Sequence, residues 1–484
     1  MSNAIAGLEP QLVWKYFAEI AQIPRCSKHE ERMTRYVLDT ARRLGLVAKT
    51  DKVGNVAVKK PASPGKERAK RIALQGHLDM VCEKNKDKTH DFSRDPIELV
   101  RKGDLLMANG TTLGADNGIA VATNLAIMED KTLVHGPLEF LFTVDEETGL
   151  TDATFLERTF LESKTLMNLD SEEEGSLYVG CSGGKDTTGI WAAPTDAAPK
   201  GFQAAHLMVS GLKGGHSGLE IHQGRGNAIK IMNRALLALD ALGARLATFD
   251  GGNKRNAIPR ECEAVAWLPA KAWDAALKAV EDFEKLAKAE IGTVDPGLRV
   301  TLAPVKQKGG RMLKKAVQKK LLATISALPH GVIKMSADIP GLTETSTNVA
   351  VVTTAKGKIS LATSQRSSVD SEIREICHTV KAIFELGGAS VLQGDGYPGW
   401  KPNLQSPILK LAKRTYQELY GKEPEIKAIH AGLECGIIGE RMPGMDMVSF
   451  GPTLEGVHSP DEKIHIESVG KYWKFLLAVL KNVN

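Results

Sequence analysis

Short apolar runs alternate with amphipathic stretches over the first 186 residues of the chain. Residues 8–23 carry apolar side chains at helical spacing, and so do residues 27–45, which open on Ser27, with Glu30 three positions later, and end on a glycine. Ser and Glu at that spacing are typical of a helix start, and glycine of a helix end. β-type runs such as LVAKTDK, NVAVKK and RIALQG follow. The alternation predicts an α/β fold with a mostly parallel sheet flanked by helices.

The pattern changes near residue 187. A Pro- and Ala-rich connector, WAAPTDAAPKG, is followed by a mixture of strand-like and helical segments, and two helices are predicted near 406–420 and 467–482. A chain of 484 residues is too long for one compact core. We therefore expect one domain built from 1–186 and 396–484, with an α+β domain, 187–395, inserted into it.

Metal-binding residue types follow several strand-like segments of the first domain. RIALQGHLDMV, TTLGADNG, LEFLFTVDEETG and TLMNLDSEEEG carry, in order, His77 and Asp79, Asp116, Glu146 and Glu147, and Asp170. Side chains beyond the carboxyl ends of strands in an open α/β sheet converge on one crevice. One histidine, two aspartates and a glutamate suit zinc, with manganese or cobalt as second choices.

Each of these segments also has an ordinary structural interpretation. A His-Leu-Asp sequence after a strand is more often a hydrogen-bonded loop, and paired glutamates usually lie on a solvated face. The acidic run DSEEEG lacks the spacing of a calcium loop. Repetition of the strand-then-acid pattern, in chain order over a hundred residues, favours a metal site.

Composition excludes several other classes of partner. The net charge of +5 is small, and the densest basic run, 59–71, is typical of a solvated loop, so no nucleic-acid partner is expected. No window reaches about 18 uninterrupted apolar residues, and no signal peptide precedes the first helix, so we expect no membrane segment. The cysteines are scattered without a CxxC pair, which indicates reduced thiols and a cytoplasmic protein: Cys26, Cys82, Cys181, Cys262, Cys377 and Cys435.

The motifs GHLDMV, TTLGADNG, TVDEETG and NLDSEEEG together resemble the two-zinc exopeptidase family that includes aminoacylase and carboxypeptidase G. GLKGGHSGLEIH, RNAIPRE, YPGW, HAGLECG, DMVSFGPT and VHSPDEKIHIESVG are similar to its aminoacyl-histidine dipeptidase branch (peptidase D). The resemblance spans nearly the whole chain. It implies a catalytic domain with an inserted lid, and hydrolysis of small peptides, in particular Xaa-His dipeptides such as β-alanyl-histidine.

The resemblance also implies two zinc ions per chain. Asp116, Glu147 and His458 would hold one, while Asp116, His77 and Asp170 would hold the other, so that Asp116 bridges them. Asp116 suits the bridge because it lies at a turn leading into a helix.

Two further acids are left without a ligand role. On an extended segment, residues i and i+2 point the same way, so Asp79 can orient the imidazole of His77. The residues alone leave open which of Glu146 and Glu147 is the base and which the ligand. The resemblance makes Glu146 the base that takes a proton from the metal-bound water and passes it to the leaving amine.

The lid contributes the remaining expected site residues. His216, in GGHSG, is the candidate for stabilising the oxyanion, although a histidine that completes a turn is the alternative. Arg366 resembles the arginine that binds the substrate's terminal carboxylate. Asn256 is expected to assist at the carbonyl or carboxylate, and the turn at Gly432 to offer backbone N–H groups. His430 is interpreted as structural.

Alternative functions and assemblies remain open. One is an N-acyl amino acid amidohydrolase of the same family, and another is a metal-free, non-catalytic relative. The presence of Glu146 beside a complete ligand set argues against the latter. A homodimer through the lid is compatible with the resemblance, and His216 then serves either its own site or the partner's, its own being favoured.

Overall fold

The computed structural model describes residues 3–150, 152–306 and 309–484, and the chain divides into two compact units. Unit 1 contains the described residues up to Cys181, together with Trp400–Ala428 and Leu433–Asn484. Unit 2 contains Ser182–Gly399 and Ile429–Gly432. Among the described helices, none is both long and apolar enough to cross a membrane.

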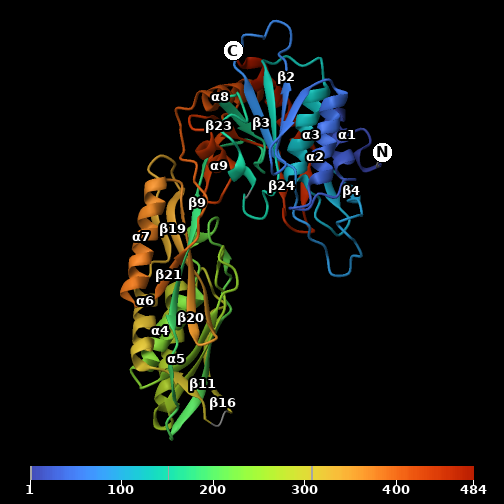
Figure 1. Ribbon diagram of the computed structural model, residues 1–484. Coiled ribbons are helices and arrows are strands. Elements are labelled where there is room, and N and C mark those ends of the chain that lie inside the picture. The colour runs from blue at the N-terminus through green and yellow to red at the C-terminus, as the bar shows by residue number, and fades with distance from the viewer. Residues whose placement is uncertain (1–2, 151, 307–308) are drawn as a thin grey trace. The chain divides into compact units, whose positions relative to one another are not determined.

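An eight-stranded sheet forms the centre of unit 1 (Figure 1). Its strands, in spatial order, are β1 (Val47–Thr50), β2 (Val56–Lys60), β6 (Leu138–Thr143), β3 (Ile72–His77), β7 (Thr165–Asn168), β23 (Asp446–Ser449), β8 (Ser176–Cys181) and β22 (Glu425–Ile429). The neighbouring strands β6, β3, β7 and β23 are parallel, whereas β1, β2 and β6 pair antiparallel. Every residue of β3 and β6 is buried, as expected for central parallel strands.

Helices lie on both sides of this sheet (Figure 1). The helix α3 (Ala115–Glu129) packs against β3 and against α1 (Gln11–Ile20), and α8 (Pro407–Tyr420) packs against β23 and α10 (Ile466–Asn482). Unit 1 also contains α2 (Glu31–Arg43), α9 (Glu434–Arg441), the short helices η1 (Asn3–Ile5) and η2 (Asp152–Phe155), and a small sheet of β24 (Leu454–Glu455), β25 (Lys463–His465), β5 (Leu105–Ala108) and β4 (Leu99–Lys102).

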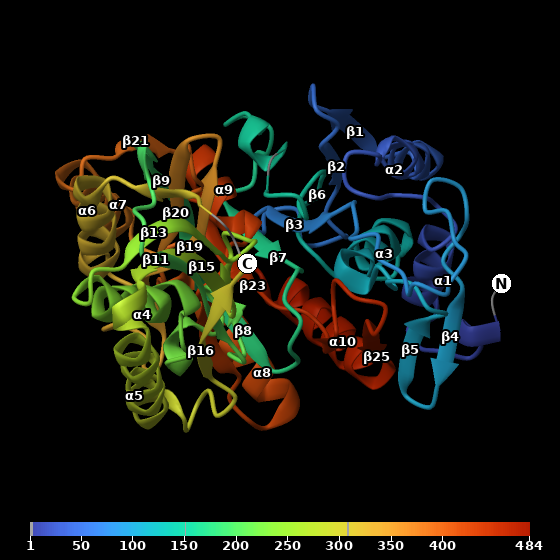
Figure 2. The same ribbon diagram turned by 90° about the horizontal axis from the view of Figure 1, so that it is seen from below.

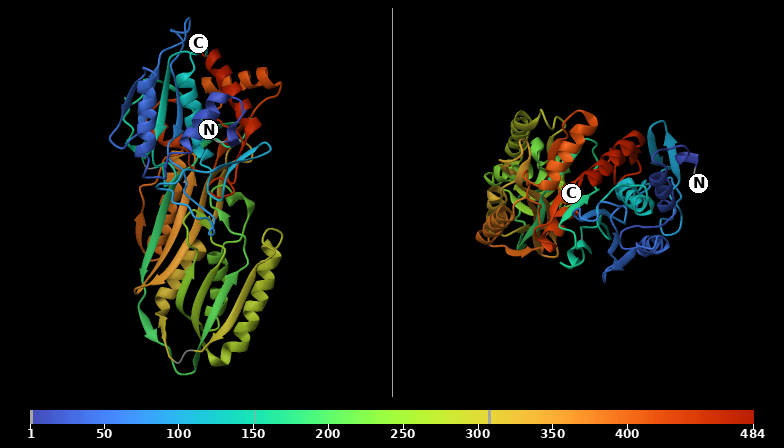
Figure 3. Two further views of the ribbon diagram at one scale, coloured as in Figure 1. Left: turned by 90° about the vertical axis from the view of Figure 1, so that its right-hand side faces the viewer. Right: turned by 90° about the horizontal axis from the view of Figure 1, so that it is seen from above.

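Unit 2 is built on a nine-stranded antiparallel sheet with its long helices on one face (Figures 2 and 3). Its strands are β16 (Arg299–Val305), β11 (Phe202–Ser210), β15 (Cys262–Pro269), β13 (Arg245–Gly251), β19 (Thr343–Ala355), β20 (Lys358–Ser367), β9 (Gly183–Ala192) and β21 (Ser390–Gln393), with β18 (Gly331–Met335) beside β19. The helices are α4 (Ala228–Asp240), α5 (Trp273–Ile291), α6 (Lys315–Ala327) and α7 (Asp370–Leu386). Their apolar faces and the sheet enclose a continuous core.

Short elements complete unit 2. They are the strand pairs β10 (Thr195–Ala197) with β17 (Arg311–Leu313) and β12 (Gly215–His216) with β14 (Ala257–Ile258), and the helices η3 (Ile221–Gln223) and η4 (Ala270–Ala272).

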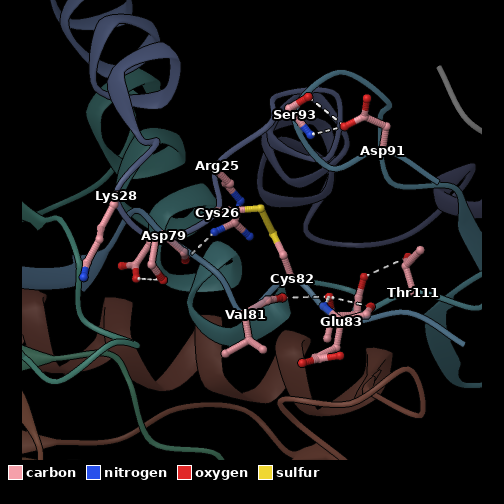
Figure 4. Close-up of a disulfide and its surroundings, with 12 residues drawn as sticks. Arg25, Cys26, Lys28, Asp79, Val81, Cys82, Glu83, Asp91, Ser93 and Thr111 are labelled. Carbon is pink, nitrogen blue, oxygen red and sulfur yellow. Dashed lines mark hydrogen bonds between the residues drawn. A yellow bond between two sulfur atoms is a disulfide. The ribbon is translucent and has the colours of Figure 1, made fainter.

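Cys26 and Cys82 form a disulfide, so the expectation that all six cysteines are reduced thiols is wrong for this pair (Figure 4). The pairing joins the segment before α2 to the loop after β3, with Cα atoms 5.7 Å apart. The N–H of Met80 also donates to the carbonyl of Arg25 at 3.1 Å. The sequence contains no signal for this pairing because the two cysteines are 56 residues apart. The other four cysteines are buried and unpaired.

Replacing both Cys26 and Cys82 by serine should lower the free energy of unfolding by about 2–4 kcal/mol, because the disulfide closes a long loop. Denaturant unfolding, followed by circular dichroism, measures this difference. Wild-type protein treated with a thiol reductant should lose the same amount, whereas the double variant should not respond to the reductant. Identical unfolding midpoints for reduced and oxidised wild type would contradict the prediction.

Candidate active site

The predicted metal-binding side chains of unit 1 lie together at the carboxyl ends of the central parallel strands. His77 is the last residue of β3, Glu147 follows the end of β6, and Asp170 lies two residues beyond β7. Asp116 lies in the first turn of α3, and His458 lies between β24 and β25. Parallel strands that end at the same edge of the sheet explain why these distant residues meet.

Their ligand atoms form two groups that share Asp116. His77, Asp116 and Asp170 form the first group, and Asp116, Glu147 and His458 the second, with the ligand atoms in each within 4.8 Å of one another. One Asp116 oxygen, Oδ1, lies 3.1 Å from His77 Nε2, and the other, Oδ2, lies 3.1 Å from His458 Nε2. Glu146 belongs to a third such group, with His77 and Glu147, and therefore lies beside both of the others.

Asp79 occupies the position expected of a residue that orients His77. Its Oδ1 is 3.2 Å from His77 Nδ1, on the ring edge opposite the nitrogen that faces Asp116. Its carboxylate also accepts the N–H groups of Glu146 and Glu147 at 3.1 Å each, and the hydroxyl of Ser27 at 2.8 Å. Asp79 thus connects the loop after β3 with the loop after β6.

Two buried charged residues that sequence reasoning missed support this arrangement. The Arg25 guanidinium donates to the carbonyls of Leu78 and Asp79 at 2.9 and 2.7 Å, and to the carbonyl of Gly114. The Glu462 carboxylate accepts the four consecutive backbone N–H groups of residues 113–116, at 2.7–3.2 Å. An anion at the N-terminus of α3 satisfies N–H groups that have no partner within the helix.

Gly114 is required at this turn. It has a φ of 70°, and an added Cβ would lie 2.6 Å from Arg25 Nη2. The glycine in TTLGADNG therefore has a packing reason in addition to its conformation.

The local electrostatics favour positive charge. Hydrogen bonds to Asp116 and Glu147 raise the pKa of His458 to about 11. Burial alone would lower the pKa of His77, but Asp170, Asp116 and Asp79 outweigh it and raise that pKa well above its usual value. Burial raises the pKa of Glu146 strongly, as expected for a carboxyl group in an acidic, desolvated cluster.

Divalent cations fit this set of side chains. Glu147 Oε1 is buried and has no hydrogen-bond partner, although a buried carboxylate oxygen normally has one. Asp170 Oδ1 is buried 3.3 Å from His77 Nε2. Each group offers imidazole nitrogen and carboxylate oxygen, the donor set that zinc accepts. The shared Asp116 offers one oxygen to each group.

In unit 2, His216 has a defined tautomer. Its Nδ1 accepts the backbone N–H groups of Gly218 and Leu219 at 3.2 and 3.0 Å, so the ring proton is on Nε2. Burial, and then the charge of Arg366, lowers the pKa of His216 to about 4, which keeps the ring neutral. His216 therefore completes a turn, as the structural alternative proposed, and also carries an N–H donor.

Arg366 lies on β20, is buried, and donates to the hydroxyl of Tyr397 at 2.9 Å. Its Nε has no hydrogen-bond partner. Among the described residues, no carboxylate is within ion-pair distance of its guanidinium, so its charge is available to an anion. Asn256 and His216 both line an open pocket of about 750 Å³ within unit 2.

The segment that carries Gly432 belongs to unit 2, although its neighbours in sequence belong to unit 1. Within it, His430 is buried, and its Nε2 lies 2.7 Å from the Ser346 hydroxyl. Gly218 permits the backbone of His430 to approach closely, because a Cβ on Gly218 would lie 2.1 Å from the His430 carbonyl oxygen.

Relatives of known activity share the sequence and fold of the chain. It is 42% identical to the cytosol non-specific dipeptidase of Escherichia coli (strain K12), with 99% of each chain covered. The crystal structure of aminoacylhistidine dipeptidase from Vibrio alginolyticus has a TM-score of 0.91 and 42% identity, covering 99% of this chain and 98% of that one. A tripeptidase from Staphylococcus aureus, with a TM-score of 0.57 and 17% identity over 98% of each chain, shares the fold.

These similarities confirm the predicted fold class and the resemblance to the aminoacyl-histidine dipeptidases. The family model for peptidase family M20/M25/M40 matches residues 73–482, a range that includes all of the metal-binding residue types described above. This chain is a peptidase that belongs to peptidase family M20/M25/M40.

Proposed function

We propose that the protein hydrolyses dipeptides, among them Xaa-His dipeptides such as β-alanyl-histidine, with two zinc ions per chain. The observation that carries this proposal is the pair of ligand groups that share Asp116, with Glu146 beside both. The names of the Escherichia coli and Vibrio alginolyticus relatives support a dipeptide substrate, and the first also supports a cytoplasmic location. A homodimer through unit 2 stays a prediction.

We assign Asp116, Glu147 and His458 to one ion and Asp116, His77 and Asp170 to the other. When bound, the two ions supply Lewis acidity, which polarises the scissile carbonyl and makes water a better nucleophile. Glu146 takes a proton from the attacking water and delivers it to the leaving amine. The raised pKa of Glu146 suits this double role, because a base of very low pKa would not return the proton.

Residues of unit 2 are assigned to the substrate. The Nε2–H of His216 is a neutral donor suited to the oxyanion of the tetrahedral intermediate. Arg366, buried and without a carboxylate partner, is suited to the terminal carboxylate. Asn256 and the backbone at Gly432 complete this binding. An N-acyl amino acid amidohydrolase would use the same groups on a different acyl donor.

The direct test is a panel of dipeptides, tripeptides and N-acyl amino acids, assayed with and without a chelator. We expect dipeptides to be cleaved, Xaa-His members included, with activity lost to the chelator and restored by zinc. Preference for N-acetylated amino acids over dipeptides would favour the amidohydrolase, and chelator-insensitive cleavage would refute the metal mechanism.

The substitution Glu146→Gln should reduce kcat by about 10²–10⁴-fold, because it removes the proton-transfer group and no ligand. Its metal content, measured by atomic emission, should equal that of the wild type. Asp116→Ala is the matched comparison, since loss of the shared ligand should remove both metal and activity. Zinc loss from Glu146→Gln, or two ions retained by Asp116→Ala, would contradict these assignments.

Arg366 should make the enzyme select peptides with a free C-terminal carboxylate. A C-terminally amidated dipeptide should therefore be a poor substrate of the wild type. Arg366→Ala should raise KM for the free acid sharply and erase the preference, while metal content stays unchanged. Equal kcat/KM for acid and amide in the wild type would refute this role.

A further inference from the structure

A row of buried polar side chains crosses the central strands of unit 1. It runs through four neighbouring strands, β6, β3, β7 and β23, which Figure 2 labels, and consists of Thr143, Gln75, Asn168 and Ser449. All four side chains are fully buried, as is Glu434 at the start of α9, on which the row ends. We refer to these five residues as the polar row.

Every hydrogen bond along the row is donated toward Glu434. The Ser449 hydroxyl donates to Asn168 Oδ1, and Asn168 Nδ2 donates to Gln75 Oε1. Gln75 Nε2 donates to Glu434 Oε2 at 2.6 Å, and the Thr143 hydroxyl donates to the same oxygen at 2.7 Å. Hydrogen bonds aligned in one direction polarise one another, so the Glu434 carboxylate at the end strengthens each hydrogen bond of the row.

The row lies directly beneath two of the proposed metal ligands. Gln75 precedes His77 by two residues within β3, so their side chains project to the same side of the sheet. Asn168 is the last residue of β7 and precedes Asp170 by two residues. Gln75 and Asn168 are register partners across β3 and β7. Asn168 Oδ1 also accepts the backbone N–H of Asp170 at 3.3 Å.

Burying this row of polar side chains costs desolvation free energy, and the packing of the strands does not require polar residues there. Central parallel strands covered on both faces normally carry apolar residues, and each buried polar group must find a partner to avoid a desolvation penalty. Glu434 Oε1 has no hydrogen-bond partner, so the row retains a buried, incompletely satisfied carboxylate close to the acidic cluster. Neither feature is needed to pair the strands.

We propose that the polar row positions His77 and Asp170, and thereby sets the affinity of the metal sub-site that these two residues form with Asp116. Gln75 and Asn168 are positioning residues, and Glu434 is the fixed acceptor that aligns them. Among the described residues, neither Glu147 nor His458 bonds to the row, and their sub-site shares only Asp116 with the one that the row positions. This inference rests on the proposed two-ion function.

The test is a zinc titration of the full-length protein against a chromophoric chelator, comparing wild type with Gln75→Met. Methionine keeps the length of the side chain and removes both its donor and its acceptor. We expect one of the two zinc equivalents to bind about 10–100-fold more weakly, the range for loss of a partner that orients a ligand. Excess zinc should restore kcat, because no group that touches substrate has changed.

Unit 2 provides a matched control. Gln365 is fully buried there and bonds to the hydroxyls of Thr187, Thr347 and Thr363 at 2.8–3.2 Å. Gln365→Met removes the same groups from a comparable buried environment and should leave both zinc affinities unchanged. If Gln75→Met does not fold, Thr143→Val gives the same comparison, because it removes one donor to Glu434 and one acceptor for Gln75 Nε2.

A double-mutant comparison identifies the affected ion. In a His77→Ala background, one zinc equivalent should already bind weakly. Adding Gln75→Met should then leave the affinity of the second zinc equivalent unchanged. Unaltered zinc binding in Gln75→Met, an equal loss in Gln365→Met, or equal weakening of both equivalents would overturn the proposal. A wild type that binds no zinc would instead refute the proposed function.

Discussion

The concentration of buried negative charge at one edge of the unit 1 sheet is the constraint on which the rest of the site depends. Asp79, Asp116, Glu147 and Asp170 are largely shielded from water, and carboxylates in such surroundings are costly unless positive charge or hydrogen-bond donors compensate them. Arg25 is the buried guanidinium beside them. The remaining compensation comes from imidazoles, backbone N–H groups and the cations that we propose.

Much of the surrounding structure can be understood as a response to this charge. Burial alone would raise the pKa of Asp79, but His77, the Ser27 hydroxyl and the backbone N–H of Glu147 outweigh it and lower that pKa to about 2. Glu462 is held by the N-terminus of α3, so that this helix presents Asp116 without leaving its own N–H groups unpaired. The donors and acceptors are supplied by segments far apart in sequence, which makes the site a product of the whole unit.

The candidate residues of unit 2, in contrast to the acidic cluster of unit 1, are suited to binding negative charge. These residues are a buried arginine without a carboxylate partner and a neutral histidine with a defined N–H donor, both suited to negative charge on a substrate. The short segment 429–432 joins this unit although α9, which begins at Glu434, belongs to unit 1. One motif, HAGLECG, therefore supplies His430 and Gly432 to unit 2 and the end of the polar row to unit 1.

The sequence by itself was sufficient for the features that depend on neighbouring residues. Strand-like segments followed by metal-binding residue types predicted the cluster of His77, Asp116, Asp170 and the pair Glu146–Glu147, because strand ends in a parallel sheet meet at one edge. The spacing of two between His77 and Asp79 predicted their contact for a similarly local reason. The helices and strands came from hydrophobic periodicity, which is also local.

Only the tertiary structure decided which distant residues complete the site. Arg25, Glu434 and Glu462 have no local signature, since each acts on backbone or side-chain groups of another segment. Ser27 shows the limit most clearly. Its spacing to Glu30 predicted a helix cap, but its hydroxyl bonds to Asp79, and α2 begins only at Glu31. The pairing of Cys26 with Cys82 was likewise set by the fold, because only packing of the segment before α2 against the loop after β3 brings the two sulfur atoms together.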